Sequence, residues 1–138
     1  MKREIKFRGK RIDNGEWVYG YLIGTDVIVG DIVDWDDEYF CTEFWYKVDP
    51  ETVGQYTGIK DSTNDEQWYE GDVLTPNPHS QRTELEVICY DSYQGKYKSV
   101  PISLYNSNAG EGGWTGYDIK SYQKRVGNIY DNPNLLEG

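Results

Sequence analysis

The chain has 138 residues and a formal net charge of −10, with 37% hydrophobic and 15% aromatic residues. This length suits one domain, over residues 1–138, whose core is large enough to need no disulfide or metal. The apolar runs are too short to cross a membrane, and no apolar stretch follows the charged N-terminus. We therefore expect a cytoplasmic protein without a signal peptide.

The composition favours strands over helices. Thirteen Tyr, five Trp and three Phe supply most of the bulky apolar surface, and fifteen Gly and five Pro imply many turns. Aromatic and β-branched residues are typical of strands, and no stretch sustains the 3.6-residue apolar period of a helix. Many short strands at spacings of about 8–12 residues predict an all-β barrel or sandwich.

The first predicted element is a hairpin of residues 5–12 and 16–23 around Asp13-Asn14-Gly15. Asn-Gly between two alternating apolar runs indicates a type I′ turn, in which both central residues adopt positive φ. Gly20 lies inside the second strand, which indicates a bulge or the close approach of another backbone.

The next elements lie in an acidic part of the chain. Residues 26–33 are predicted to form one strand or a pair of strands, and residues 34–38 an acidic loop. Residues 39–48 alternate aromatic and polar side chains and are predicted to form a strand. A short strand over 52–57 then leads to a polar connection at 60–65.

The second half of the chain continues the pattern. Residues 67–70 lead into a Gly71-Asp72 turn and another strand that begins at Val73. After a loop over 75–83, residues 84–93 and 96–105 are predicted to form a second long hairpin.

The C-terminal part begins with a glycine-rich loop over 106–116. Strands are predicted over 117–124 and 125–130. Residues 133–137 then form one short helical turn that begins at a proline, a residue favoured at that position.

Charge is unevenly distributed. Residues 1–25 hold six Lys or Arg and three acids, whereas residues 26–51 hold nine acids and one Lys. An acidic protein repels phosphate backbones, so nucleic acid is an unfavoured partner, although the basic strand of residues 2–11 is a local exception.

Three segments together resemble the YopX family of phage and prophage proteins. They are REIKFR at 3–8 followed by WVYG at 17–20, GQYTGIKD at 54–61 followed by WYEGDV at 68–73, and VGNIYDNP at 126–133 followed by Leu135-Leu136. The resemblance implies a β-roll or SH3-like barrel, an origin in a phage or prophage, and no assigned activity. One departure is Ser62-Thr63-Asn64-Asp65, where the family usually has a Lys-Asn-Gly-like turn.

The motif residues are those that build turns and fill a small barrel. Glycines permit positive φ or close packing, aspartates hold turns, and Tyr and Trp rings fill the interior. We therefore expect structural roles for Gly54, Gln55, Tyr56, Thr57, Gly58, Asp61, Tyr69, Glu70, Gly71, Asp72, Gly127 and Asn128.

Candidates for chemistry are few, and we expect no catalytic, metal or cofactor site. His79 is the only histidine and lies in a loop, where an exposed side chain is the simplest interpretation. Glu70 and Asp72 could form an acid–base pair, but the glycine between them favours a turn. Cys41 and Cys89 are far apart in the sequence, and we expect two reduced, partly buried thiols.

Candidate interaction residues lie in two loops. One loop is acidic and does not match a calcium-binding pattern; the other presents a tryptophan suited to anchor an interface. The candidates are Asp34, Asp36, Asp37, Glu38 and Trp114.

Three functions follow, in order of preference. The first is a non-enzymatic phage accessory protein that acts through protein–protein contacts, including contacts with its own copies. The second is an acidic inhibitor that mimics DNA and binds a basic host protein. The third is an SH3-like module that binds nucleic acid through residues 2–11.

Overall fold

The computed structural model describes residues 4–107 and 113–137. The chain divides into two compact units, of which the first ends at Tyr56 and the second begins at Thr57. The mainly β prediction is confirmed. Each strand pair whose register is defined is antiparallel, and the pairings among the described residues form open sheets.

The first unit is built from short strands and one 3-10 helix. These are β1 (Phe7–Lys10), β2 (Trp17–Ile23), β3 (Val27–Val29), β4 (Ile32–Trp35), β5 (Phe40–Thr42), β6 (Trp45–Lys47), η1 (Pro50–Thr52) and the start of β7 (Gly54–Lys60). Its main sheet has the order β6-β3-β2-β1-β7. The strand β7 crosses the boundary between the units, and β8 of the second unit pairs with it.

The β1–β2 hairpin is confirmed, but its turn is not type I′. Among Asp13, Asn14 and Gly15, only Gly15 has a positive φ, of 73°. Its N–H donates to the carbonyl of Arg11 at 2.9 Å. The loop is therefore longer than two residues, and one glycine supplies its single left-handed position.

Gly20 allows two strands of this sheet to come close together. A Cβ at this position would lie 2.2 Å from the backbone oxygen of Val29. The prediction of a close backbone approach is confirmed. On this same face of the sheet, Ile28 and Val48 are buried and pack over Gly9.

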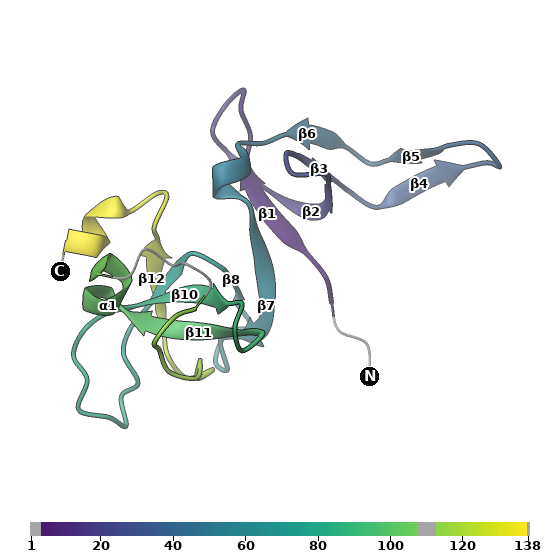
Figure 1. The fold of residues 1–138 in the computed structure, drawn as a ribbon. Coiled ribbons are helices and arrows are strands. Elements are labelled where there is room, and N and C mark those ends of the chain that lie inside the picture. The colour runs from purple at the N-terminus through teal and green to yellow at the C-terminus, as the bar shows by residue number, and fades with distance from the viewer. Residues whose placement is uncertain (1–3, 108–112, 138) are drawn as a thin grey trace. The chain divides into compact units, whose positions relative to one another are not determined.

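The strands β4 and β5 form a two-stranded sheet of their own. Figure 1 shows them as an arm that extends beyond the ends of β3 and β6. The predicted strand over 39–48 is therefore two strands, and Asp34 of the predicted acidic loop lies within β4.

The second unit contains the larger apolar core. Its further elements are β8 (Gln67–Tyr69), β9 (Asp72–Leu74), β10 (Glu86–Asp91), β11 (Lys96–Pro101), α1 (Ile102–Ser107), β12 (Arg125–Asn128) and η2 (Pro133–Glu137). The sheet order is β11-β10-β9-β12. One core cluster is centred on Val73, Val87 and Val100, and another on Trp68, Leu74 and Ile88.

Two strand predictions fail in this unit. The predicted strand over 96–105 ends at Pro101, which has no N–H to extend the ladder. The chain continues as α1, whose Ile102 is buried in the core. The predicted strand over 117–124 is irregular, because the buried Gln123 amide takes backbone hydrogen bonds with Thr75 and Lys120.

The short helical turn predicted at the C-terminus is confirmed as η2. No helix among the described residues has the length and apolarity needed to span a membrane.

Candidate interaction surface

The arm, residues 31–43, continues the ladder of the main sheet without a change of register. Val29 pairs with Trp45 in the sheet, and Ile32 pairs with Thr42 in the arm. Backbone hydrogen bonds join the residues between these pairs. Because side chains alternate along a strand, Ile32 lies on the same face as the buried Ile28.

A bulge in β4 gathers the apolar side chains of the arm on that face. The register shifts between Ile32 and Asp34, which leaves Val33 as an extra residue in the ladder, and Trp35 pairs with Phe40 beyond it. Without the shift, Ile32 and Trp35 would occupy opposite faces, because they are three residues apart. Ile32, Trp35 and Phe40 therefore form one surface, the apolar face of the arm.

The apolar face changes from core to surface along its length. Ile28 is 0% exposed, whereas Ile32 is 56%, Phe40 53% and Trp35 77% exposed. Contiguous exposed apolar surface of this kind marks interaction sites in soluble proteins. Sequence reasoning pointed to the acids of this loop but missed these three residues. The signal was a pair of aromatic residues flanking an acidic turn.

The opposite face of the arm is acidic. Asp31 and Glu43 lie across from each other on it, and Asp34 follows beyond the bulge. These three residues are the acidic face of the arm. The Asp31 carboxylate raises the pKa of Tyr21, which is exposed on the neighbouring strand β2.

The tip of the arm carries the other predicted acids. Asp36 Oδ1 accepts hydrogen bonds from the N–H groups of Glu38 and Tyr39, at 2.8 and 3.0 Å. These hydrogen bonds hold the turn at the tip, and they also lower the pKa of the Asp36 carboxyl group. Asp37 and Glu38 are exposed. In the described part of the chain, no ion pair involves residues 31–43.

A cavity of about 330 Å³ lies at the root of the arm. Its lining includes Tyr19, Tyr21, Asp31 and Glu43. Lys6 also lines it, and its Nζ lies 5.9 Å from the centre of the Tyr19 ring. Aromatic walls beside carboxylates are suited to hold a cation.

The basic strand of residues 2–11 is engaged within the first unit. Arg8 is buried, and its guanidinium carbon lies 4.6 Å from the centre of the Trp17 ring. Arg11 forms an ion pair of 2.6 Å with Asp13. The first two cations of the strand lie outside the described residues.

Trp114 is not an exposed anchor, which corrects the prediction for this residue. It is half-buried, packs against the core of the second unit, and stacks on Tyr105 with ring centres 5.2 Å apart. Its carbonyl accepts a hydrogen bond from Lys98 Nζ at 2.9 Å. Part of the predicted loop over 106–116 lies outside the described residues.

The motif segment at 54–61 forms the strand β7 (Gly54–Lys60). Gly54 and Gln55 pair with β1, and Tyr56 and Thr57 are buried. Gly58 adopts a φ of 86°, the conformation that glycine was expected to supply. These contacts are those of a structural strand.

Asp61 organises the turn after β7. Its carboxylate accepts hydrogen bonds from the N–H and hydroxyl of Thr63 and from Lys124 Nζ, and these lower its pKa to about 2. Asp65 adopts a φ of 59°, a left-handed conformation that glycine adopts readily. In the turn where the sequence departs from the family pattern, the left-handed position is occupied by Asp65, a residue type that tolerates this conformation.

Tyr69, Glu70, Gly71 and Asp72 form the turn between β8 and β9. Asp72 Oδ2 accepts a hydrogen bond from the Tyr69 N–H at 2.7 Å, and Gly71 has a φ of 93°. Arg125 lies 3.7 Å from the other oxygen of Asp72. Asp72 thus holds the turn, as predicted, and Glu70 lies within it.

Gly127 and Asn128 also have structural contacts. Asn128 Oδ1 accepts hydrogen bonds from the N–H groups of Tyr130 and Asp131, at 2.9 and 2.8 Å. A Cβ at Gly127 would lie 2.4 Å from Asn132 Oδ1. Both residues shape the turn that follows β12.

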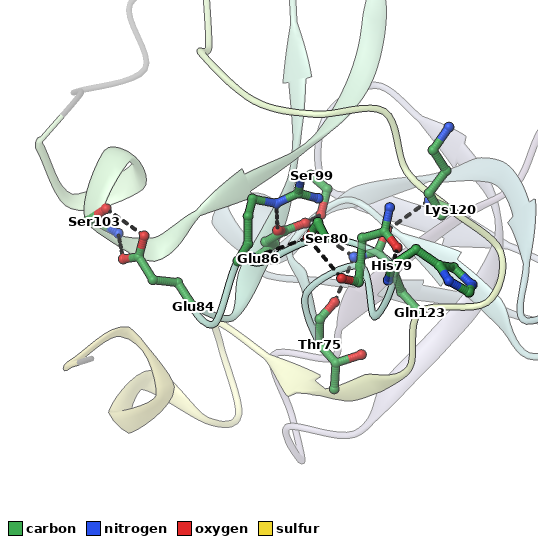
Figure 2. A network of polar contacts seen from close by, with 11 residues as sticks. Thr75, His79, Ser80, Glu84, Glu86, Ser99, Ser103, Lys120 and Gln123 are labelled. Carbon is green, nitrogen blue, oxygen red and sulfur yellow. Dashed lines mark hydrogen bonds and ion pairs between the residues drawn. The ribbon is translucent and has the colours of Figure 1, made fainter.

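Sequence reasoning did not anticipate a buried carboxylate at Glu86. It accepts hydrogen bonds from Ser99, Arg82 and Gln123, at 2.6, 2.9 and 3.2 Å, and Gln123 also donates to the Thr75 carbonyl (Figure 2). Each hydrogen bond to Glu86 ties β10 to a neighbouring segment. The network therefore stabilises the packing of the second unit and is not arranged as a binding site.

His79 lies beside this network but makes different contacts. Its ring packs edge-on against Tyr122, with centres 5.0 Å apart. The Ser80 hydroxyl donates to the Asn77 carbonyl. These bonds are those of a loop.

Across residues 4–107 and 113–137, no group of three or more His, Cys, Asp or Glu side chains is placed to hold a metal. Both cysteines are free thiols. Cys89 is buried, and burial raises the pKa of its thiol. Cys41 is exposed on the arm, contrary to the expectation of partial burial.

Comparisons with known proteins agree with the segments noted in the sequence. A family model described as YopX protein matches residues 6–137. The fold is similar to the crystal structure of protein EF1440 from Enterococcus faecalis, with a TM-score of 0.56 and 19% identity over 98% of this chain and 99% of that one. No curated protein matches the chain.

Proposed function

This chain belongs to the YopX family, and we propose that it acts by binding another protein and not by catalysis. The observation that carries the proposal is the apolar face of the arm, on which Ile32, Trp35 and Phe40 are each more than half exposed. The motif residues, by contrast, are occupied in turns and strands. A surface for contact is therefore better supported than a site for chemistry.

The proposal also has a biological part. The family resemblance implies a phage or prophage origin, so the protein is an accessory protein that acts in the cytoplasm of a bacterial host. Its partner is then a protein of the host or of the phage.

Site-specific photo-cross-linking in cells tests the proposal. A photoreactive amino acid replaces Trp35 on the apolar face or, as a control, Tyr93, which is 81% exposed in the second unit. We expect discrete protein adducts at position 35 that are absent at position 93 and that fall when unmodified protein is added in excess. No adduct at position 35, or the same adducts at both positions, would contradict the proposal.

A second candidate is an acidic inhibitor that mimics DNA. Residues 31–43 hold six acids and no Lys or Arg, which favours a basic binding site on the partner. Affinity purification from host lysate tests this candidate. It predicts basic nucleic-acid enzymes among the retained proteins, and retention of only neutral or acidic proteins would exclude it.

Direct binding of nucleic acid through residues 2–11 has less support. Arg8 is buried and Arg11 is paired with Asp13, so neither is presented to a phosphate backbone. We expect unchanged mobility of a DNA probe in a gel shift at low salt. A retarded band would restore this candidate.

A further inference from the structure

We propose that the arm docks into a groove of a partner protein that is different from this chain. The groove has an apolar floor against the apolar face of the arm and Lys or Arg side chains along its rim. This inference rests on the proposed function and adds the chemistry of the partner to it.

The apolar floor follows from the arrangement of the arm. The face that carries Trp35 and Phe40 is the continuation of the face that is core at Ile28. A two-stranded ribbon is marginally stable in water unless a further surface packs against it. The rest of the described chain leaves Trp35 77% exposed, so in this inference the partner supplies that surface.

The basic rim follows from the charges around the apolar face. Residues 31–43 carry six acids and no Lys or Arg, and the described part of the chain provides no ion pair to any of them. Asp37 and Glu38 lie at the tip, whereas Asp31, Asp34 and Glu43 form the opposite face. Complementary charge on the partner would both steer its approach and fix its register.

The cavity at the root of the arm adds a second acidic feature. Its volume is about 330 Å³, and Tyr19, Tyr21, Asp31 and Glu43 line it together with Lys6. A Lys or Arg at the edge of the groove would meet these rings and carboxylates.

A second copy of the chain is a poor occupant, because most of its described cations are already engaged. Six of the described cations form ion pairs within the chain: Arg11, Arg82, Lys96, Lys98, Lys124 and Arg125. Lys6, Arg8 and Lys10 lie over aromatic rings. Each copy also carries a net charge of −10, so two copies repel each other.

The first part of the test compares two exposed tryptophans, Trp35 in β4 and Trp45 in β6. Their side chains lie on opposite faces of the ladder that runs from the main sheet into the arm. The probe is a fluorescent amphipathic peptide of leucine and lysine, and binding is measured by anisotropy. Trp35→Ser should weaken binding at least about ten-fold, as loss of an interface anchor does. Trp45→Ser is the matched control, because Trp45 is 65% exposed but lies on the other face. It should change binding by less than about three-fold.

The second part of the test asks whether the acidic residues of the arm contribute to peptide binding. Asp37→Lys should weaken binding of the leucine–lysine peptide, and most strongly at low salt, whereas Glu51→Lys should not. Both residues are exposed acids of the first unit, but Glu51 lies in η1, outside the arm. A leucine–glutamate peptide should not bind, and a serine–lysine peptide should bind at least about ten-fold more weakly.

Any other experimental result would contradict a specific part of the inference. If Asp37→Lys abolishes binding while Trp35→Ser does not, the arm recognises charge alone and the DNA mimic replaces this inference. If light scattering shows self-association that Trp35→Ser disperses, the occupant is a second copy. Cross-links at position 35 without peptide binding overturn the partner chemistry but leave the proposed function intact. If cross-links and peptide binding are both absent, both fail.

Discussion

At the scale of single residues, Gly20 shows how one missing side chain sets the spacing of two strands. Gly20→Ala would place a methyl group 2.2 Å from the Val29 carbonyl oxygen, which is backbone and cannot rotate away. We expect a loss of about 2 kcal/mol or more in the free energy of unfolding, measured with urea. Gly15→Asn is the control, because Gly15 has open space and asparagine tolerates its φ of 73°. A Gly20→Ala protein as stable as wild type would contradict this packing.

Asp61 makes a second prediction at this scale, which concerns pH. Hydrogen bonds from Thr63 and Lys124 lower the pKa of Asp61 to about 2, below the value of about 4 in an unfolded chain. The charged carboxylate therefore adds stability above pH 4, and this contribution disappears as the pH falls towards 2.

Unfolding of wild type and Asp61→Asn at a series of pH values measures this contribution. The wild type should be the more stable protein at pH 6, and the difference should shrink steadily between about pH 4 and 2. Asp37→Asn, which alters an exposed acid at the tip of the arm, should show no such convergence. A constant difference for Asp61→Asn would show that the carboxylate charge contributes nothing.

At the scale of elements, the arm is an addition to the sheet and not part of its core. The Gly30 N–H donates to the Phe44 carbonyl at 3.0 Å, so these two residues can close a shorter hairpin. Replacing residues 31–43 with Asn-Gly should therefore preserve β3 and β6. We expect the free energy of unfolding to change by less than about 1 kcal/mol, followed by circular dichroism, because the removed side chains are mostly exposed.

The same deletion should abolish binding of the leucine–lysine peptide. Loss of the folded transition on deletion would instead show that the arm supports the sheet. The arm would then be structural, and its exposed aromatic residues would need another explanation.

At the scale of the whole molecule, local stability should differ between the core of the second unit and the arm of the first unit. The second unit holds both apolar clusters, and β10 is paired on both sides and mostly buried. The arm is exposed throughout β4 and paired only within itself. Amide hydrogen exchange should therefore be at least about 100-fold slower in β10 than in β4 and β5, because exposed segments open locally. Equal rates would contradict this ranking.

The net charge of the whole molecule favours the same kind of partner as the acids of the arm. With a net charge of −10, the protein is more readily approached by a basic partner than by its own copies. The chemistry of the surface is thus consistent between the local acids of the arm and the overall field.

The sequence alone determined the mainly β fold, the first hairpin, the family and most motif roles. These features follow from local rules: alternation along strands, glycine at positive φ, and aspartate in turns. Gly71 and Asp72 form the predicted turn for that reason. The acidic loop was also found from composition, since it required no knowledge of the faces of its strands.

Only the tertiary structure decided which side chains that loop presents. The bulge at Val33 depends on pairing between β4 and β5, and it alone puts Ile32 and Trp35 on one face. Trp114 was misjudged for a related reason, because its stacking partner Tyr105 lies in α1, an element that the sequence did not predict. A sequence shows the period of a strand, but register and burial depend on partners far along the chain.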